Sequence, residues 1–130
     1  MPLLITPLYA ALAAILLLVL SFRVVRLRRR FAVGLGSGGH AELDQAMRCH
    51  GNFTEYAPIG LILIASAELS GAAAGWLHAI GVLLIVGRAA HAWGLAQSGG
   101  RSAGRTIGMV LTVTALLVGA GVNLAQYLGH

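Results

Sequence analysis

The sequence predicts an all-α integral membrane protein, a four-helix transmembrane bundle forming one domain over residues 1–130. Three observations indicate this class. Of the 130 residues, 58% are hydrophobic and only 10% are charged, whereas about a quarter of the residues in soluble domains are charged. Four apolar stretches follow one another along the chain, and at roughly 20 residues per helical span the length allows no fifth. All nine basic residues are arginines, and seven of them lie between the apolar stretches.

The four spans are predicted over residues 3–22, 41–70, 73–95 and 106–128. The first is uniformly apolar apart from a mild interruption at Pro7. The second is polar in its first half and apolar from Ile59 onward. In the third, Trp76 and Trp93 stand about 25 Å apart along a helix, which suits the two membrane interfaces, and Tyr127 has a similar place near the end of the fourth.

The arginines predict the orientation of the bundle. The first predicted loop carries Arg23, Arg26, Arg28, Arg29 and Arg30, and the third carries Arg101 and Arg105, while the second carries none. Because cytoplasmic loops are enriched in basic residues, both termini should face away from the cytoplasm. Beside a hydrophobic span, such a cluster indicates anionic lipid headgroups as its partner, and without a binding motif nucleic acid is not expected.

Other motifs in the chain do not indicate a site. Gly34, Gly36 and Gly39 spell G-x-G-x-x-G, but a dinucleotide site requires a preceding strand, and a membrane helix is predicted there instead. We therefore expect a flexible loop. The five histidines are too scattered to indicate a metal site. The single cysteine, Cys49, excludes an intrachain disulfide and is expected to pack as a small buried side chain.

The segment RCHGNFTEYAP, residues 48–58, is the most informative part of the chain. Arg48, Asn52 and Glu55 are spaced i, i+4 and i+7, so a helix places them on one stripe. Charged groups at membrane depth are costly, and these side chains must face protein, water or a ligand. Pro58 frees the carbonyl of Thr54 where the stripe ends. The spacing alone leaves two interpretations open: a ligand site, or an interhelical polar network that only stabilises the bundle.

This segment resembles the second-helix signature of the membrane-associated proteins in eicosanoid and glutathione metabolism, the MAPEG family. The pattern R-x-x-x-N-x-x-E-Y-x-P is matched by Arg48, Asn52, Glu55, Tyr56 and Pro58. The resemblance extends to the arginine-rich end of the first span, to GRAAHAWGL at residues 87–95 and to R-x-x-G at residues 105–108. It is greatest to the short bacterial members, which implies a bacterial inner-membrane protein.

The resemblance implies a homotrimer that binds glutathione between subunits near the cytoplasmic face. The residues that match glutathione-contacting positions are Arg48, Asn52, Glu55 and Tyr56. One of Arg26, Arg28 and Arg29 should match the arginine at the end of the first helix, but the arginine run leaves the register open. The catalytic arginine of the family is matched by Arg105 or Arg101, and we favour Arg105 for its R-x-x-G context.

The third span offers a further pair, Arg88 and His91, spaced i and i+3 on one side of a helix. The pair could line the cofactor site, or His91 could simply be a packed histidine. His91 and Leu95 stand where several eukaryotic relatives have tyrosines, and Gly51 replaces a side chain that is basic in some of them. Activity could therefore be altered or absent.

The predicted function is glutathione S-transferase or peroxidase activity on hydrophobic small-molecule substrates that arrive through the membrane lipids. Its mechanism would be thiolate attack, with an arginine supplying stabilising charge. Two alternatives remain: a non-catalytic trimer that binds glutathione or lipid, and a four-span proton-coupled exporter that uses Glu55.

Overall fold

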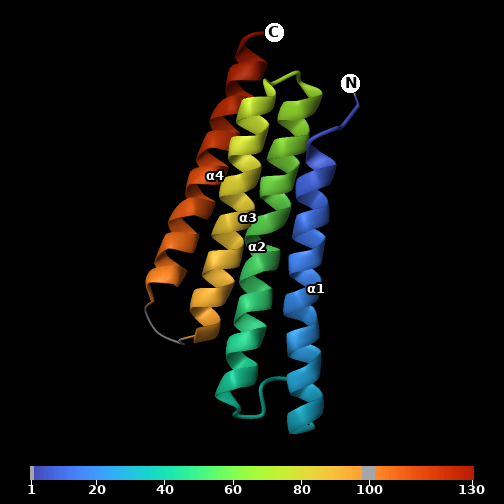
Figure 1. Ribbon diagram of the computed structural model, residues 1–130, viewed down its shortest axis with the longest axis vertical. Helices are drawn as coiled ribbons and strands as arrows, with labels where there is room; N and C mark the ends of the chain where they lie inside the picture. Colours follow the sequence, from blue (N-terminus) through green and yellow to red (C-terminus); the bar gives the residue numbers. More distant parts are fainter. Residues whose placement is uncertain (1, 98–101) are drawn as a thin grey trace.

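The computed structural model describes residues 2–97 and 102–130, which form four α-helices. They are α1 (Thr6–Phe31), α2 (Ala41–Leu69), α3 (Ala74–Gln97) and α4 (Ala103–Leu128). Successive helices run in opposite directions, so both termini lie at one end of the bundle (Figure 1). The described residues contain no strand. The predicted all-α, four-helix class is confirmed.

The basic segment after the first apolar stretch is helical, and its prediction as a loop was wrong. Helix α1 continues through the arginines to Phe31, and Arg28, Arg29 and Arg30 form its last turn. Arginine is a good helix former, and cations are stabilised at a helix C-terminus by the helix dipole. The helix ends at Ala32, whose φ of 54° lies in the left-handed region.

The glycine-rich connection between α1 and α2 packs against the helices that flank it. The Arg28 Nη1 group donates to the Gly36 carbonyl oxygen at 2.9 Å and to the Val33 carbonyl oxygen at 3.4 Å. The rings of Phe31 and His40 stack with centroids 4.0 Å apart. A helix and not a strand precedes this segment, as expected, and the loop has more contacts than the sequence suggested.

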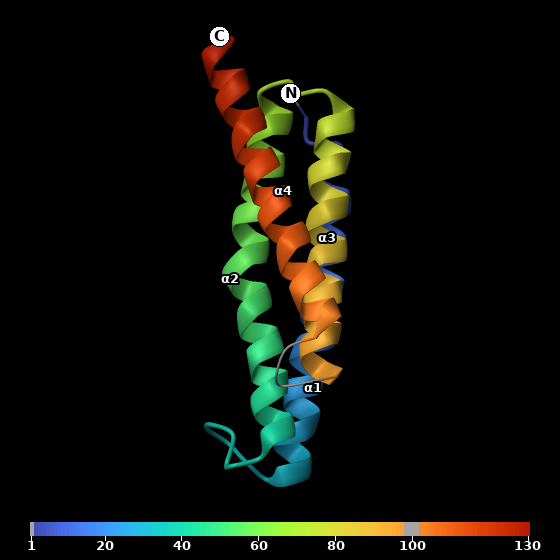
Figure 2. The ribbon, with the colours of Figure 1, turned by 90° about the vertical axis from the view of Figure 1, so that its left-hand side faces the viewer.

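Helix α3 is the inner helix of the bundle. Half of its apolar span is buried, against 17% in α1 and 22% in α4, which leaves the outer faces of those two helices uncovered. Helix α4 lies beside α3 at its start and approaches α2 toward its end (Figure 2), where Asn123 Nδ2 donates to the Leu63 carbonyl oxygen at 3.0 Å. The main apolar cluster consists of Tyr9, Ile64, Ala67, Leu77, Ile80, Leu84 and Ala115.

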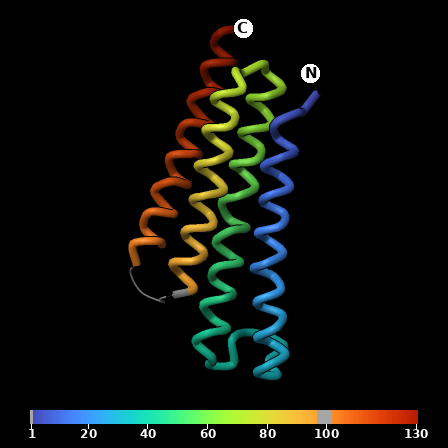
Figure 3. Tube along the Cα trace, in the orientation of Figure 1, coloured from blue at the N-terminus to red at the C-terminus, as the bar shows by residue number. Residues whose placement is uncertain are grey.

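Within residues 2–97 and 102–130, three helices, α1, α3 and α4, are long and apolar enough to cross a membrane. Helix α2 is not among these three, and its first half carries Glu42, Asp44, Arg48 and Glu55. That half lies beside the arginine-rich end of α1, and the two extend beyond the lower ends of α3 and α4 (Figure 3). The four-span topology stays a prediction.

The N-terminus of α1 is capped by a side chain from another helix. Glu68, which is buried in α2, accepts hydrogen bonds from the backbone amides of Leu4, Ile5 and Thr6 at 2.6–2.7 Å and from the Thr6 hydroxyl at 2.6 Å. The first amides of a helix have no partner within it. A carboxylate there satisfies them and also interacts favourably with the helix dipole.

Candidate functional site

Arg88 is a fully buried cation at the junction of α2, α3 and α4. Its side chain is only 1% exposed. Its Nε group donates to the Thr112 hydroxyl oxygen of α4 at 2.9 Å. Its Nη1 group donates to the Asn52 side-chain oxygen of α2, and contacts the Asn52 carbonyl oxygen at 3.4 Å. The structure therefore joins the predicted third-helix residue to one residue of the signature.

A second signature residue lies against the same guanidinium. The Arg88 guanidinium carbon stands 5.0 Å from the centre of the Tyr56 ring, within the range of a cation–π interaction. The remaining group, Nη2, is buried and has no hydrogen-bond partner among the residues that the structure describes. Buried polar groups are normally satisfied, and an orphaned guanidinium nitrogen is a natural donor to an anionic ligand.

Glycines let α3 and α4 approach until their backbones touch. A Cβ added at Gly108 would lie 2.3 Å from the backbone nitrogen of His91, and one added at Gly94 would lie 2.3 Å from that of Arg105. No side chain fits at such distances. The close approach brings Arg88 and His91 of α3 to the same level as Arg105 and Thr112 of α4.

An open groove of about 480 Å³ runs along this junction. Its lining residues are Asn52, His91, Arg105, Thr106, Met109 and Val110. His91 is only 3% exposed and still lines the groove, so the two interpretations of this histidine stay open. The groove combines polar groups from three helices with the apolar side chains of Met109 and Val110.

Arg105 also borders a second groove, of about 360 Å³. This groove is lined by Ala41, Asp44, Gln45, Arg48, Leu95 and Arg105. Helix α4 begins at Ala103, and the Ser102 hydroxyl accepts from the Arg105 backbone amide at 3.1 Å as an N-cap. The second candidate for the catalytic arginine, Arg101, lies outside the described residues.

The stripe on α2 faces outward from the single chain. Arg48 and Glu55 are exposed, and Asn52 between them is turned partly toward α3. Cys49, next to the stripe, is buried as expected, and its thiol lies 3.4 Å from the Ala92 carbonyl oxygen. A single copy thus assembles Asn52, Tyr56 and Arg88 but leaves the charged ends of the stripe uncovered.

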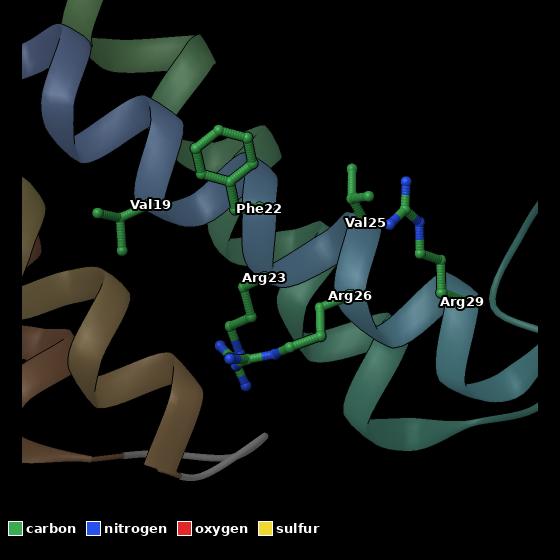
Figure 4. Close-up of a pocket in the computed structure, with 6 residues that line it drawn as sticks. All are labelled: Val19, Phe22, Arg23, Val25, Arg26 and Arg29. Atoms are coloured by element: carbon green, nitrogen blue, oxygen red, sulfur yellow. The ribbon is translucent and has the colours of Figure 1, made fainter.

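The three first-helix candidates have different surroundings. Arg28 bonds to the loop backbone as described above and lies 3.5 Å from Met47 Sδ. Arg26 and Arg29 line a groove of about 600 Å³ on the outer side of α1, together with Val19, Phe22, Arg23 and Val25. In Figure 4 the guanidinium groups of Arg23 and Arg26 turn toward each other, while Arg29 lies beside Val25. This groove shares no lining residue with the one that Asn52 and His91 line.

Two polar residues with large structural roles escaped the sequence reasoning. Thr112 bonds to Arg88, and Glu68 caps α1. Glu68 could have been noticed, because a lone carboxylate in the apolar half of a predicted span needs a partner. Nothing distinguishes Thr112 from Thr114 in the sequence, because only the packing of α4 decides which hydroxyl faces α3.

The sequence model of the MAPEG family matches residues 6–125. The chain belongs to the MAPEG family. The inner membrane protein YecN of Escherichia coli strain K12 is 42% identical over 120 residues, which cover 92% of this chain and 90% of YecN. The protein of the same name from E. coli O6:H1 strain CFT073 has the same identity and coverage. The resemblance inferred from the α2 signature is confirmed, and this MAPEG chain is a membrane protein whose family includes glutathione transferases and peroxidases.

Proposed function

We propose that this MAPEG protein binds glutathione and joins it to apolar electrophiles that enter from the bilayer, with peroxide reduction as the related activity. The observation that carries the proposal is the contact of the signature residue Asn52 with the buried Arg88, beside a groove that Arg105 also lines. We expect this site near the cytoplasmic face of the bacterial inner membrane.

The residues present fit glutathione, which carries two carboxylates, one ammonium and a thiol. Arginines bind carboxylates through paired, charge-assisted hydrogen bonds. Arg48 is exposed, and the Nη2 group of Arg88 has no partner among the described residues. Glu55, also exposed, can bind the ammonium. We assign Arg105, which lines the groove together with Asn52, to the sulfur, and glutathione supplies the nucleophilic thiolate.

A homotrimer would complete this site. Arg48 and Glu55 lie on an outward face of α2, and a charged side chain at membrane depth is costly when it faces lipid. A neighbouring copy that covers the stripe removes this cost. The arginines on the outer side of α1, Arg26 and Arg29, are then available to reach glutathione from that neighbouring copy.

The mechanism assigns each group of residues a task. Arg48, Arg88 and Glu55 bind the charged ends of the tripeptide, and Asn52 and Tyr56 orient it. Arg105 stabilises the negative charge on sulfur. In conjugation a carbon–sulfur bond forms, and the displaced group leaves the electrophile with its bonding electrons. The apolar side chains of Met109 and Val110 give the electrophile a route from the lipid.

The test is glutathione binding by the purified protein in detergent, measured by calorimetry, followed by turnover with an activated aryl chloride and with a lipid hydroperoxide. Binding with turnover supports the proposal. Binding without turnover makes the chain a non-catalytic glutathione-binding member, an outcome compatible with Leu95 at a position where some relatives have tyrosine. Failure to bind glutathione refutes the proposal, and proton-driven uptake in liposomes would then favour the exporter.

The substitution Glu55→Gln tests whether the stripe on α2 binds glutathione or only stabilises the bundle. The neutral amide cannot form an ion pair with the ammonium of glutathione, so affinity should fall by about 1–3 kcal/mol, the range for a lost charge-assisted hydrogen bond. The oligomer, measured by light scattering, should persist. A variant that binds glutathione normally but loses its oligomeric state would show that the stripe is structural.

A further inference from the structure

The buried hydroxyl of Thr112 donates one hydrogen bond and accepts another, and its neighbours determine which is which. It has no solvent exposure. Its hydroxyl donates to the Gly108 carbonyl oxygen in the preceding turn of α4, at 2.8 Å. A hydroxyl has one proton and two lone pairs, so the Thr112 oxygen is left as an acceptor, and Arg88 Nε donates to it at 2.9 Å.

Arg88 in turn determines the orientation of the Asn52 amide beside the groove. A guanidinium only donates hydrogen bonds, so the Asn52 side chain must present its oxygen to Arg88 Nη1. The choice between the two orientations of an Asn amide is usually inferred from its partners, and here the partner permits only one. Among the residues that the structure describes, the Asn52 Nδ2 group has no hydrogen-bond partner, and because Asn52 lines the groove this group is available there as a donor.

We propose that Thr112 is a positioning residue for the glutathione site: through Arg88 it fixes the Asn52 amide with its NH2 group presented to the groove, as a donor to a carboxylate or peptide oxygen of the tripeptide. This inference rests on the proposed function. In it, Thr112 supports glutathione binding without touching the ligand, and Asn52 acts as a hydrogen-bond donor to the ligand.

The chain offers matched variants for the test. Thr112→Val keeps the shape of the side chain but removes the acceptor, so Arg88 Nε loses its partner and the guanidinium turns. Glutathione affinity should fall about tenfold, the effect of losing one such hydrogen bond. Thr112→Ser keeps the hydroxyl and should bind as the unmodified protein does. Thr114→Val is the control, because among the described residues the Thr114 hydroxyl bonds within α4, to the Val110 carbonyl oxygen at 2.8 Å.

A second variant tests the donor in the groove and does not depend on how Thr112→Val folds. Asn52→Asp keeps an oxygen for Arg88 and adds an ion pair, so the melting temperature should be unchanged or higher. It removes the NH2 donor and puts a carboxylate beside the carboxylates of glutathione. We expect at least a tenfold loss of affinity in a protein of undiminished stability.

The outcomes separate this inference from the proposed function. If the unmodified protein binds no glutathione, the proposed function fails, and the inference fails with it. If it binds glutathione but Thr112→Val binds equally well, or Thr112→Ser loses as much affinity as Thr112→Val, the hydroxyl does not position the site. Full affinity in Asn52→Asp would overturn the assignment of Asn52 as a donor. In the last two cases the proposed function stands.

Discussion

At the scale of single residues, the structure explains how an apolar helix tolerates a buried arginine. An arginine at the bilayer centre costs on the order of 2.5–3.5 kcal/mol on insertion scales. Arg88 offsets part of this cost through an oxygen of Thr112, two oxygens of Asn52 and the face of Tyr56. One nitrogen is still unsatisfied among the described residues, which is unusual for a purely structural network.

Arg105 should determine catalysis more than binding. The pKa of a free thiol is about 8.5, and lowering it by about 2 units requires about 2.7 kcal/mol of differential stabilisation, which one nearby arginine in a partly dry cleft can supply. We expect Arg105→Ala to lose most conjugation, with a smaller change in glutathione affinity. The ultraviolet absorbance of bound thiolate should disappear with the activity.

The matched comparison for Arg105→Ala is Arg101→Ala, which should have a milder effect. If Arg101→Ala instead removes the thiolate absorbance and Arg105→Ala does not, the catalytic arginine has been assigned to the wrong position. If the unmodified protein shows no bound thiolate, the non-catalytic alternative becomes the better description.

Glu68 should stabilise the fold without affecting the site. Glu68→Gln keeps the size of the side chain but removes the charge that caps α1, so the melting temperature in detergent should fall by several degrees while glutathione affinity is retained. Glu42→Gln is the matched control. In the part of the chain that the structure describes, its carboxylate makes one exposed ion pair, with Arg30 at 3.8 Å, a type that contributes little. Equal melting temperatures for both variants would contradict the capping role.

At the scale of helices, the close packing of α3 on α4 determines the geometry of the site. Neither helix binds its neighbour through the hydrophobic effect once both are in lipid, so small residues and direct backbone contact matter more. At Gly87 an added Cβ would lie 2.9 Å from the Thr112 backbone nitrogen. The Arg88–Thr112 hydrogen bond therefore depends on glycine at the adjacent position.

Gly108→Ala should separate these two helices. The new methyl group has no room beside His91, and overpacking of this kind costs about 1–3 kcal/mol. We expect a lower melting temperature and weaker glutathione binding, because His91 and Arg105 move apart. Gly121→Ala, on the same helix, meets nothing within 4 Å and should leave both measurements unchanged. Normal binding by Gly108→Ala would show that the backbone contact does not determine the site.

At the scale of the whole molecule, charge is distributed unevenly between the two ends of the bundle. The arginines of α1 lie at the end opposite the termini, beside the first turns of α2 (Figures 1 and 3). The positive-inside rule assigns that end to the cytoplasm. Both termini are then expected on the non-cytoplasmic side.

Single-cysteine labelling tests this orientation in a Cys49→Ala background, in which the chain has no other cysteine. A membrane-impermeant maleimide added to spheroplasts should label His130→Cys but not Ser37→Cys. Ser37→Cys should become labelled once the membrane is permeabilised. Labelling of Ser37→Cys from outside would reverse the orientation and move the proposed site to the other face.

The sequence alone determined the fold class and the family of this protein. Four long apolar stretches indicate helices, because a backbone in lipid must satisfy its own hydrogen bonds. The α2 signature lies within one short segment, so it can be recognised without knowledge of the fold. The sequence did not predict that α1 continues through the arginine segment, because a run of arginines is equally compatible with a loop and with the last turns of a helix.

Only the tertiary structure decided which polar groups meet. Arg88 and Thr112 are separated by 24 positions, and Glu68 caps a helix that begins 62 residues earlier. Such pairings depend on the rotation and depth at which helices pack. These are set by side-chain volumes at many contacts at once, above all by the glycines between α3 and α4, so no single segment of sequence encodes them.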